Sequence, residues 1–282
     1  MPCAGRLRWL TPPVADRQAG VAGRPIGHSL SPELHRAAYT ALGLHDWTYH
    51  RIDAGEPDLA PLFDSMRADA TWVGLSMTMP LKAEAVRRAD IVDPLAARIG
   101  SANTALRGPD GAITVLTTDV DGVRAAFDEV GGRGPVAVLG SGGTARAAVA
   151  ALADDVEVLV VARSAERGDP VAALHPLGLC VGWEGFEPSD VGTVISTVPA
   201  GASDPLALRP WPSTTALVDV VYDPWPTALA ARAGAAGARV AGGLVVLVAQ
   251  AARQVALMTG RDAPVAAMRA AGEAVLAARA AG

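Results

Sequence analysis

Hydrophobic residues in the first third of the chain follow two different spacings, and one of them is helical. After the segment SLSP, apolar residues recur at i, i+3, i+4, i+7 and i+8, which is one face of a helix: Leu34, Ala37, Ala38, Ala41 and Leu42. Pro32 suits the first helical position, Ser31 suits the capping position before it, and Gly43 ends the pattern. We therefore predict a capped helix that begins at Pro32.

The second spacing is that of short strands. WTYHRID has β-branched and aromatic character, and WVGLSMT is a similar segment that runs toward Pro80. Residues 1–19 carry Pro and Arg without periodicity, so we expect a loose N-terminal extension and ordered structure from about Val21. The alternation of strand and helix predicts an α/β domain over residues 20–119.

A second α/β unit follows the Gly-rich connection GGRGP. Its predicted strands are four short apolar runs: Pro135–Leu139, Glu157–Val161, Val191–Thr197 and Ala216–Val221. An Ala-rich helix to Ala153 separates the first two. This pattern predicts a Rossmann-type, doubly wound parallel sheet over residues 120–243. Helical periodicity returns over residues 244–282, where Pro264 opens the last helix, and these helices are expected to pack on the first domain.

Composition narrows the functional classes. The chain has 282 residues, half of them hydrophobic, and its 24 basic and 29 acidic side chains give a formal charge of −5. This length predicts about two domains, and the apolar content excludes an intrinsically disordered chain. A mildly acidic chain without a dense basic face is not expected to bind nucleic acid. There is also no run of about 18 apolar residues to predict a membrane span.

The cysteines indicate a reducing compartment. Cys3 and Cys180 lie far apart, and neither is surrounded by metal-ligand spacing. The N-terminal segment has arginines but no apolar core of a secretory signal. We expect a soluble, cytoplasmic protein without a metal site.

The segment VAVLGSGGTARAA carries a candidate dinucleotide site. Gly140, Gly142 and Ala145 form a G-x-G-x-x-A arrangement between a predicted strand and a predicted helix. Gly140 permits a tight turn, Gly142 lets a pyrophosphate approach the backbone, and the helix N-terminus supplies free N–H donors. The alternative is an ordinary Gly-rich turn, but the flanking elements favour dinucleotide binding.

The next strand indicates which dinucleotide is bound. An NAD site usually has Asp or Glu at the end of this strand, to bind the ribose hydroxyls. Here the strand ends in VVARSAER, with Arg163 at that position and Arg167 close behind. Guanidinium groups pair with a phosphate that a carboxylate would repel. The sequence therefore favours NADP, unless both arginines are only solvated loop charges.

Polar residues in four other segments are weak signals individually. The serines of GHSLSP could be helix caps, the lysine of MTMPLK a solvated charge, and the polar residues of SANT and TTDVDG turn formers. The residues in question are Ser29, Ser31, Thr78, Lys82, Asn103 and Asp119.

In their order and spacing, these segments resemble the shikimate dehydrogenase family. The matching segments span about 230 residues. They are GRPIGHSLSPELH, GLSMTMPLK, GSANT, TTDVDG, VLGSGGTARA, ARSAER, DVVYDPWPT and GGLVVLVAQAA. The resemblance implies a two-domain enzyme that reduces 3-dehydroshikimate to shikimate with NADPH, in the pathway to chorismate and the aromatic amino acids.

The resemblance also implies roles for particular residues. Ser29 and Ser31 would hold the substrate carboxylate, Tyr222 would line the same cleft, and Lys82 would be the catalytic lysine with Asp119 beside it. The implied ligands of the ring hydroxyls are Thr78, Asn103, Asp119 and Gln250. The predicted cofactor site comprises Gly140, Ser141, Gly142, Gly143, Thr144, Ala145, Arg163, Ser164, Arg167, Thr197, Val220 and Gly243. We expect a small-molecule substrate and a monomer or homodimer.

The chain departs from the family pattern at a few positions. Most members have Asn at Ser76 and at Thr117, and the Asn of the cofactor-loop motif is Ala162 here while both arginines are kept. The usual N-A-T at the end of a later strand is Ser196-Thr197-Val198. We expect these changes to alter the fit around the substrate and to leave the chemical groups in place.

Two alternatives stay open at this point. A quinate/shikimate dehydrogenase, or one that acts on an aminoshikimate, would share most of these residues. A non-catalytic NADP-binding sensor on the same scaffold is a different class, and retention of Lys82 and Asp119 argues against it because a sensor has no use for a proton donor.

Overall fold

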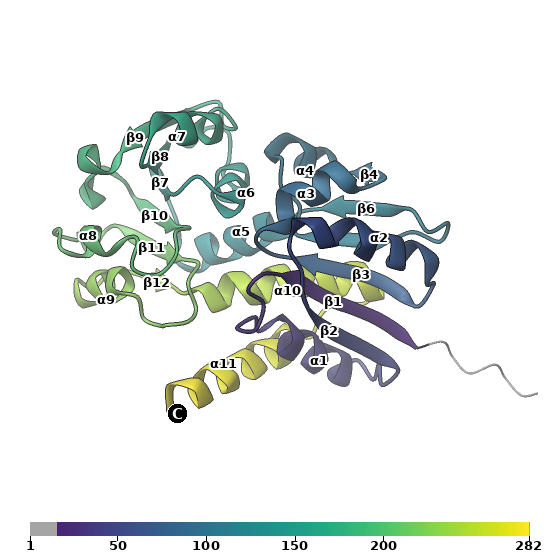
Figure 1. Cartoon of the computed structure of the whole chain (residues 1–282). Helices are drawn as coiled ribbons and strands as arrows, with labels where there is room; N and C mark the ends of the chain where they lie inside the picture. The colour runs from purple at the N-terminus through teal and green to yellow at the C-terminus, as the bar shows by residue number, and fades with distance from the viewer. Residues whose placement is uncertain (1–15, 282) are drawn as a thin grey trace, which may run out of the picture.

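The computed structural model describes residues 16–281, which form two α/β halves joined by long helices (Figure 1). Cys3 and most of the predicted N-terminal extension lie outside the described residues. The first strand begins at Arg17, earlier than the start near Val21 that the sequence predicts.

The first half is built on a mixed six-stranded sheet. Its strands are β1 (Arg17–Gly23), β2 (Trp47–Asp53), β3 (Trp72–Met77), β4 (Ile91–Val92), β5 (Thr104–Arg107) and β6 (Ile113–Leu116). Their order is β2-β1-β3-β5-β6-β4, and β5 runs antiparallel to both of its neighbours. The two predicted strands are β2 and β3. The short strands β4 to β6 carry little sequence signal of their own.

The helices of this half include the predicted one. They are α1 (Ser31–Ala41), α2 (Leu59–Ala68), α3 (Leu81–Arg88) and α4 (Pro94–Ile99), with a 3-10 turn at Glu56–Asp58. Helix α1 starts at Ser31, and Leu30 holds the capping position. Ser31 is therefore not the cap that the sequence predicts; instead, the Ser29 Oγ accepts a hydrogen bond from the Ser31 N–H at 3.3 Å. Gly43, with φ of 67°, follows the helix as predicted.

The second half is a parallel sheet in the doubly wound order. Its strands are β7 (Val136–Leu139), β8 (Val158–Ala162), β9 (Gly178–Gly182), β10 (Thr193–Ser196), β11 (Ala216–Asp219) and β12 (Val240–Ala241). The order is β12-β11-β10-β7-β8-β9, and every pairing is parallel. This confirms the Rossmann-type prediction. Its further elements are α6 (Gly143–Ala151), α7 (Ala165–Ala172), α8 (Asp204–Ala207) and α9 (Ala228–Ala235), with 3-10 turns at Trp183–Gly185 and Pro188–Asp190.

Apolar runs in these strands arise because both faces of the sheet are covered. Val136 and Val138 of β7 belong to one buried apolar cluster, whereas Ala137 and Leu139 belong to another. Successive side chains of a strand point to opposite faces, so a strand buried on both sides is apolar throughout. This is why the sequence reveals these strands clearly.

Two helices connect the halves, α5 (Asp119–Glu129) and α10 (Gly243–Thr259), and the last helix, α11 (Val265–Ala281), packs on α1 and α10. Figure 1 shows α10 running between the halves and α11 lying beside α1. A Cβ atom on Gly122 of α5 would lie only 2.6 Å from the Val246 oxygen of α10, so these two helices pack backbone to backbone. Among residues 16–281, no helix is long and apolar enough to cross a membrane.

Candidate active site

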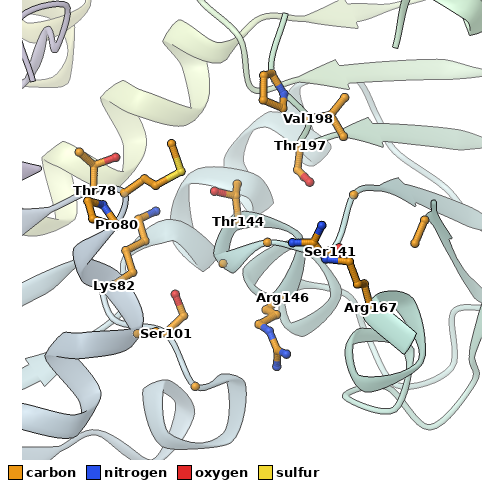
Figure 2. A pocket seen from close by; sticks show the side chains of 18 of the residues that line it. Thr78, Pro80, Lys82, Ser101, Ser141, Thr144, Arg146, Arg167, Thr197 and Val198 are labelled. Carbon is orange, nitrogen blue, oxygen red and sulfur yellow. The ribbon is translucent and has the colours of Figure 1, made fainter. Parts of the chain in front are cut away.

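Two cavities meet between the halves. The larger has a volume of about 590 Å³ and the smaller about 200 Å³. Three residues line both: Thr78, Lys82 and Thr144. Figure 2 shows Lys82 and Thr144 facing each other across this junction. A molecule in one cavity would therefore contact a molecule in the other beside Lys82.

The predicted glycine-rich turn forms one wall of the larger cavity. Gly140 has a φ of 114°, and a Cβ atom there would lie 2.7 Å from the Thr197 Oγ1. Only glycine suits this backbone conformation and this close approach. Gly142 has no atom within 4 Å of an added Cβ, so its backbone is open to the cavity. Because α6 begins at Gly143, its free N–H groups and the positive end of its dipole serve this wall.

Two arginines that follow strand β8 line the larger cavity. Arg163 follows β8 directly, Arg167 lies in α7, and both are exposed and line the cavity. Figure 2 shows Arg167 reaching toward Ser141. Neither guanidinium is paired with a carboxylate within residues 16–281. Two unpaired arginines beside a helix N-terminus fit a dinucleotide that carries an extra phosphate.

Most of the predicted cofactor residues line this cavity, and four do not. The lining residues are Gly140, Ser141, Gly142, Gly143, Thr144, Arg163, Arg167 and Thr197. Ala145 is fully buried within α6, and Ser164 lies between the two arginines without lining the cavity. Val220 and Gly243 line the smaller cavity instead. These two residues are in close contact, as a Cβ atom added to Gly243 would lie 2.1 Å from the Val220 carbonyl oxygen.

Seven of the eight predicted substrate residues line the smaller cavity: Ser29, Ser31, Thr78, Lys82, Asp119, Tyr222 and Gln250. Ser29 and Ser31 lie at the start of α1, and both are buried. The backbone carbonyl oxygen of Ser29 accepts a hydrogen bond from the Arg51 Nη2 at 2.8 Å. Burial raises the pKa of Tyr222 above its ordinary value, so its hydroxyl stays protonated at neutral pH.

Lys82 and Asp119 form an ion pair in the cavity wall. Lys82 is the second residue of α3 and Asp119 the first of α5, and the Lys82 Nζ is 2.6 Å from the Asp119 Oδ2. Their side chains are only 18% and 11% exposed. The N-terminus of α5 favours the carboxylate, and the pairing holds the ammonium group at the cavity junction. The remaining ammonium protons are placed to hydrogen-bond a molecule in the cavity.

Asn103 lies behind this wall and does not line the cavity. It is 2% exposed, and its Nδ2 donates to the Asp119 Oδ1 and the Gln250 Oε1, each at 2.8 Å. Its Oδ1 accepts from the Thr118 N–H at 2.8 Å. In this structure Asn103 therefore orients two predicted substrate ligands.

Sequence reasoning missed three polar residues of the smaller cavity, namely His28, Ser76 and Gln254. Ser76 and Gln254 both line it, and the Ser76 Oγ donates to the Gln254 Oε1 at 2.8 Å. Ser76 was noted only as a departure from the family pattern. Gln254 lies one helical turn after Gln250, so the i, i+4 spacing of two polar residues in an apolar helix was the available signal.

The described residues offer no metal site, since residues 16–281 contain no cluster of three or more potential ligand side chains among His, Cys, Asp and Glu.

Comparisons with known proteins place these observations in one family. Residues 21–105 match the shikimate dehydrogenase substrate binding domain, and residues 243–271 match the shikimate 5'-dehydrogenase C-terminal domain. A protein of Methylobacterium radiotolerans named shikimate dehydrogenase (NADP(+)) is 37% identical over 254 residues, which cover 84% of this chain and 89% of that protein.

Two solved structures extend the comparison. The shikimate dehydrogenase of Mycobacterium tuberculosis is 42% identical, with a TM-score of 0.82, and the match covers 92% of this chain and 99% of that one. The shikimate 5-dehydrogenase of Thermus thermophilus, solved in complex with NADP(H) and shikimate, is 32% identical, with a TM-score of 0.83. That match covers 92% of this chain and all of the other.

Proposed function

The chain belongs to the shikimate dehydrogenase family, and on that premise we propose that it reversibly reduces 3-dehydroshikimate to shikimate with NADPH. The reaction belongs to chorismate and aromatic amino-acid biosynthesis. The observation that carries the proposal is the ion pair of Lys82 and Asp119, which lies where the two cavities meet.

Lys82 provides the proton for the reduction. When bound, NADPH supplies the hydride, and the ring carbonyl oxygen gains negative charge as the hydride arrives. A cationic donor at that oxygen lowers the barrier. The Lys82 ammonium is held at the junction by Asp119 and donates the proton to this oxygen. In the reverse direction the same pair accepts the proton of the ring hydroxyl.

The smaller cavity supplies the groups that a polyhydroxylated carboxylate needs. Ser29 and Ser31 hold the carboxylate through their hydroxyls. Ring hydroxyls are bound by Thr78, Asp119 and Gln250, and Tyr222 lines the cleft. Asn103, which the family pattern counts among the ligands, contributes by orienting Asp119 and Gln250.

The larger cavity fits NADP. The turn at Gly140–Gly143 and the N-terminus of α6 hold the pyrophosphate, and Arg163 and Arg167 hold the 2′-phosphate. We assign cofactor binding to residues 120–243 and substrate binding to residues 20–119 together with the helices of 244–282. Cytoplasmic location and a monomeric or homodimeric state stay predictions.

An assay for wild-type turnover separates an enzyme from an NADP-binding sensor. Shikimate and NADP+ should give NADPH at a rate proportional to enzyme, measured by absorbance. A parallel fluorescence titration with NADPH should show saturable binding. Binding of NADPH without turnover of shikimate would contradict the proposed activity. It would favour a sensor, because a sensor needs only the cofactor binding of the larger cavity.

A further inference from the structure

A line of buried hydrogen bonds runs through the wall of the smaller cavity. The Tyr49 hydroxyl donates to the Ser76 Oγ at 2.7 Å, and the Ser76 Oγ donates to the Gln254 Oε1 at 2.8 Å. The Gln254 Nε2 then donates to the Thr104 Oγ1 at 2.9 Å, and the Thr104 Oγ1 donates to the Asn103 Oδ1 at 2.9 Å. All five residues are at most 4% exposed, so solvent cannot replace these bonds.

One backbone group fixes the direction of the whole line. The Thr118 N–H can only donate, and it lies 2.8 Å from the Asn103 Oδ1, so this end of the amide must be the oxygen. The single hydroxyl hydrogen of Thr104 goes to the same oxygen. The Thr104 oxygen must then accept, which requires the amide nitrogen of Gln254 on that side.

The orientation of the Gln254 amide in turn fixes which atoms donate in the Ser76 and Tyr49 hydrogen bonds. With its nitrogen toward Thr104, Gln254 presents its Oε1 to Ser76, whose hydroxyl must donate. The Ser76 oxygen is left as an acceptor for the Tyr49 hydroxyl. Burial raises the pKa of Tyr49 well above its ordinary value, so this donor stays protonated.

The other end of the line reaches the predicted ligands. Both hydrogens of the Asn103 Nδ2 are used, by the Asp119 Oδ1 and the Gln250 Oε1. The Gln250 Nε2 is therefore the free end of that amide, and it donates to no other residue within the described part of the chain. Since Gln250 lines the cavity, it presents a donor to the substrate.

We propose that Tyr49 is a positioning residue of the substrate site. Its hydroxyl holds the Ser76 Oγ in place, and Ser76 in turn holds the Gln254 side chain; both Ser76 and Gln254 line the smaller cavity. This inference rests on the proposed function, which names the reaction that it serves. No residue of the line from Tyr49 to Gln254 touches the reacting atoms in this account; its effect is on how the substrate is held.

Tyr49→Phe removes only the hydroxyl and keeps the ring that stacks on His35 at 4.0 Å. Without this donor, Ser76 loses one of its two hydrogen-bond partners, so the Ser76 and Gln254 side chains are held less firmly in the cavity wall. We expect the KM for shikimate to rise about tenfold, with kcat within about threefold and the KM for NADP within about twofold of wild type, as for loss of one buried hydrogen bond.

Tyr39→Phe is the matched control. Tyr39 is also buried, at 2% exposed, and its ring also lies against His35, but its hydroxyl has no hydrogen-bond partner within residues 16–281. Tyr39→Phe should leave all three constants unchanged. Thermal midpoints of both variants show whether a kinetic change reflects only lost stability.

Ser76→Ala tests the line from its next member and serves if Tyr49→Phe does not fold. It should raise the KM for shikimate as Tyr49→Phe does. The proposal is overturned if these variants keep a wild-type KM, or if Tyr39→Phe shifts it equally. Wild-type protein in the same assay separates the two claims: a wild type that does not turn over shikimate refutes the proposed function and this inference with it.

Discussion

The two cavities that meet at Lys82 are built by different means. The larger is formed largely by backbone, namely the turn at Gly140–Gly143 and the start of α6, and Arg163 and Arg167 in its wall are exposed and separate. The smaller is formed by side chains that hydrogen-bond to each other, such as Asn103 with Asp119 and Gln250. A substitution in the larger cavity should therefore affect only the contact that it removes. A substitution in the smaller cavity should also disturb the side chains that hydrogen-bond to the substituted residue.

The difference is physical. Backbone donors at a helix N-terminus are oriented by the helix itself and need no supporting side chains. A polyhydroxylated ring needs several donors and acceptors in fixed positions, and each buried group must have its own partner. The smaller cavity therefore depends on side chains that hydrogen-bond to each other within its wall, such as Ser76 and Gln254.

The largest expected effect is at the junction of the two cavities. Lys82→Ala removes the proton donor, and kcat should fall by about a hundred- to ten-thousandfold, since this is the usual value of general acid catalysis. The KM for shikimate should change far less, and NADPH should still bind in a fluorescence titration. Near wild-type turnover by Lys82→Ala would contradict the role of Lys82 as proton donor and show that it is only a surface charge.

Coupling within the smaller cavity is tested by Asp119→Asn. This variant should be impaired to a similar degree, because Asp119 holds the ammonium group at 2.6 Å. The double variant with Lys82→Ala should lose much less than the product of the two losses, as residues that act as one unit do. Independent effects would contradict the coupled account of this cavity.

The larger cavity should behave differently. Arg163→Asp replaces a phosphate ligand with a repelling charge, so the KM for NADP should rise about a hundredfold, on the order of 3 kcal/mol. The KM for NAD should change little. Initial rates with both cofactors measure this, and equal effects on the two would mean that the arginine is structural.

The buried His35, which stacks on Tyr49, predicts that stability depends on pH. His35 is fully buried, and desolvation lowers its pKa from 6.5 to about 4. Between these values the unfolded chain binds more protons than the folded one, so the free energy of unfolding decreases as the pH falls from 6.5 to 4. The loss is about 3 kcal/mol for this shift.

His35→Phe removes the titrating group and keeps a ring against Tyr49. Urea unfolding of wild type and variant between pH 7 and pH 4 should show a flatter pH dependence for the variant by about that amount. The variant also loses the hydrogen bond from the His35 Nδ1–H to the Ser31 carbonyl oxygen. This loss lowers stability by the same amount at every pH. Parallel pH curves would show that His35 does not titrate as described.

A smaller effect is expected at the carboxylate end. Ser31→Ala should raise the KM for shikimate about tenfold through loss of one hydrogen bond to a charged group. Its thermal midpoint should stay near wild type, because the capping contact at this helix start is made by the Ser29 Oγ. Ser29→Ala should change both quantities. A Ser31→Ala variant that melts early but binds shikimate normally would refute the carboxylate contact.

The same contrast explains how much could be predicted from the sequence. The larger cavity is encoded in contiguous motifs, so GSGG and ARSAER reveal most of it by themselves. The smaller cavity brings together residues as distant as Ser29 and Gln250, and only the family resemblance grouped them. The sequence marks Ser76 only as a departure from the family pattern, because its role depends on Tyr49, which comes from a different strand. Val220 and Gly243, which the family resemblance places in the cofactor site, line the smaller cavity.

The fold shows a similar limit. Strands β7, β8, β10 and β11 are buried on both faces and stand out as apolar runs. Strands β4 to β6 are only two to four residues long and depend on pairing with neighbours for their structure. Helix α1 starts at Ser31, one residue earlier than the sequence predicts, and Leu30, which has no side-chain oxygen, holds the capping position.

The most direct test of the central claim is an initial-rate panel of shikimate and quinate against NADP+ and NAD+. The account predicts the highest kcat/KM for shikimate with NADP+, and a strong loss when either partner is exchanged. A preference for quinate with NAD+ would contradict it, because both the substrate cavity and the two arginines would then have been misassigned.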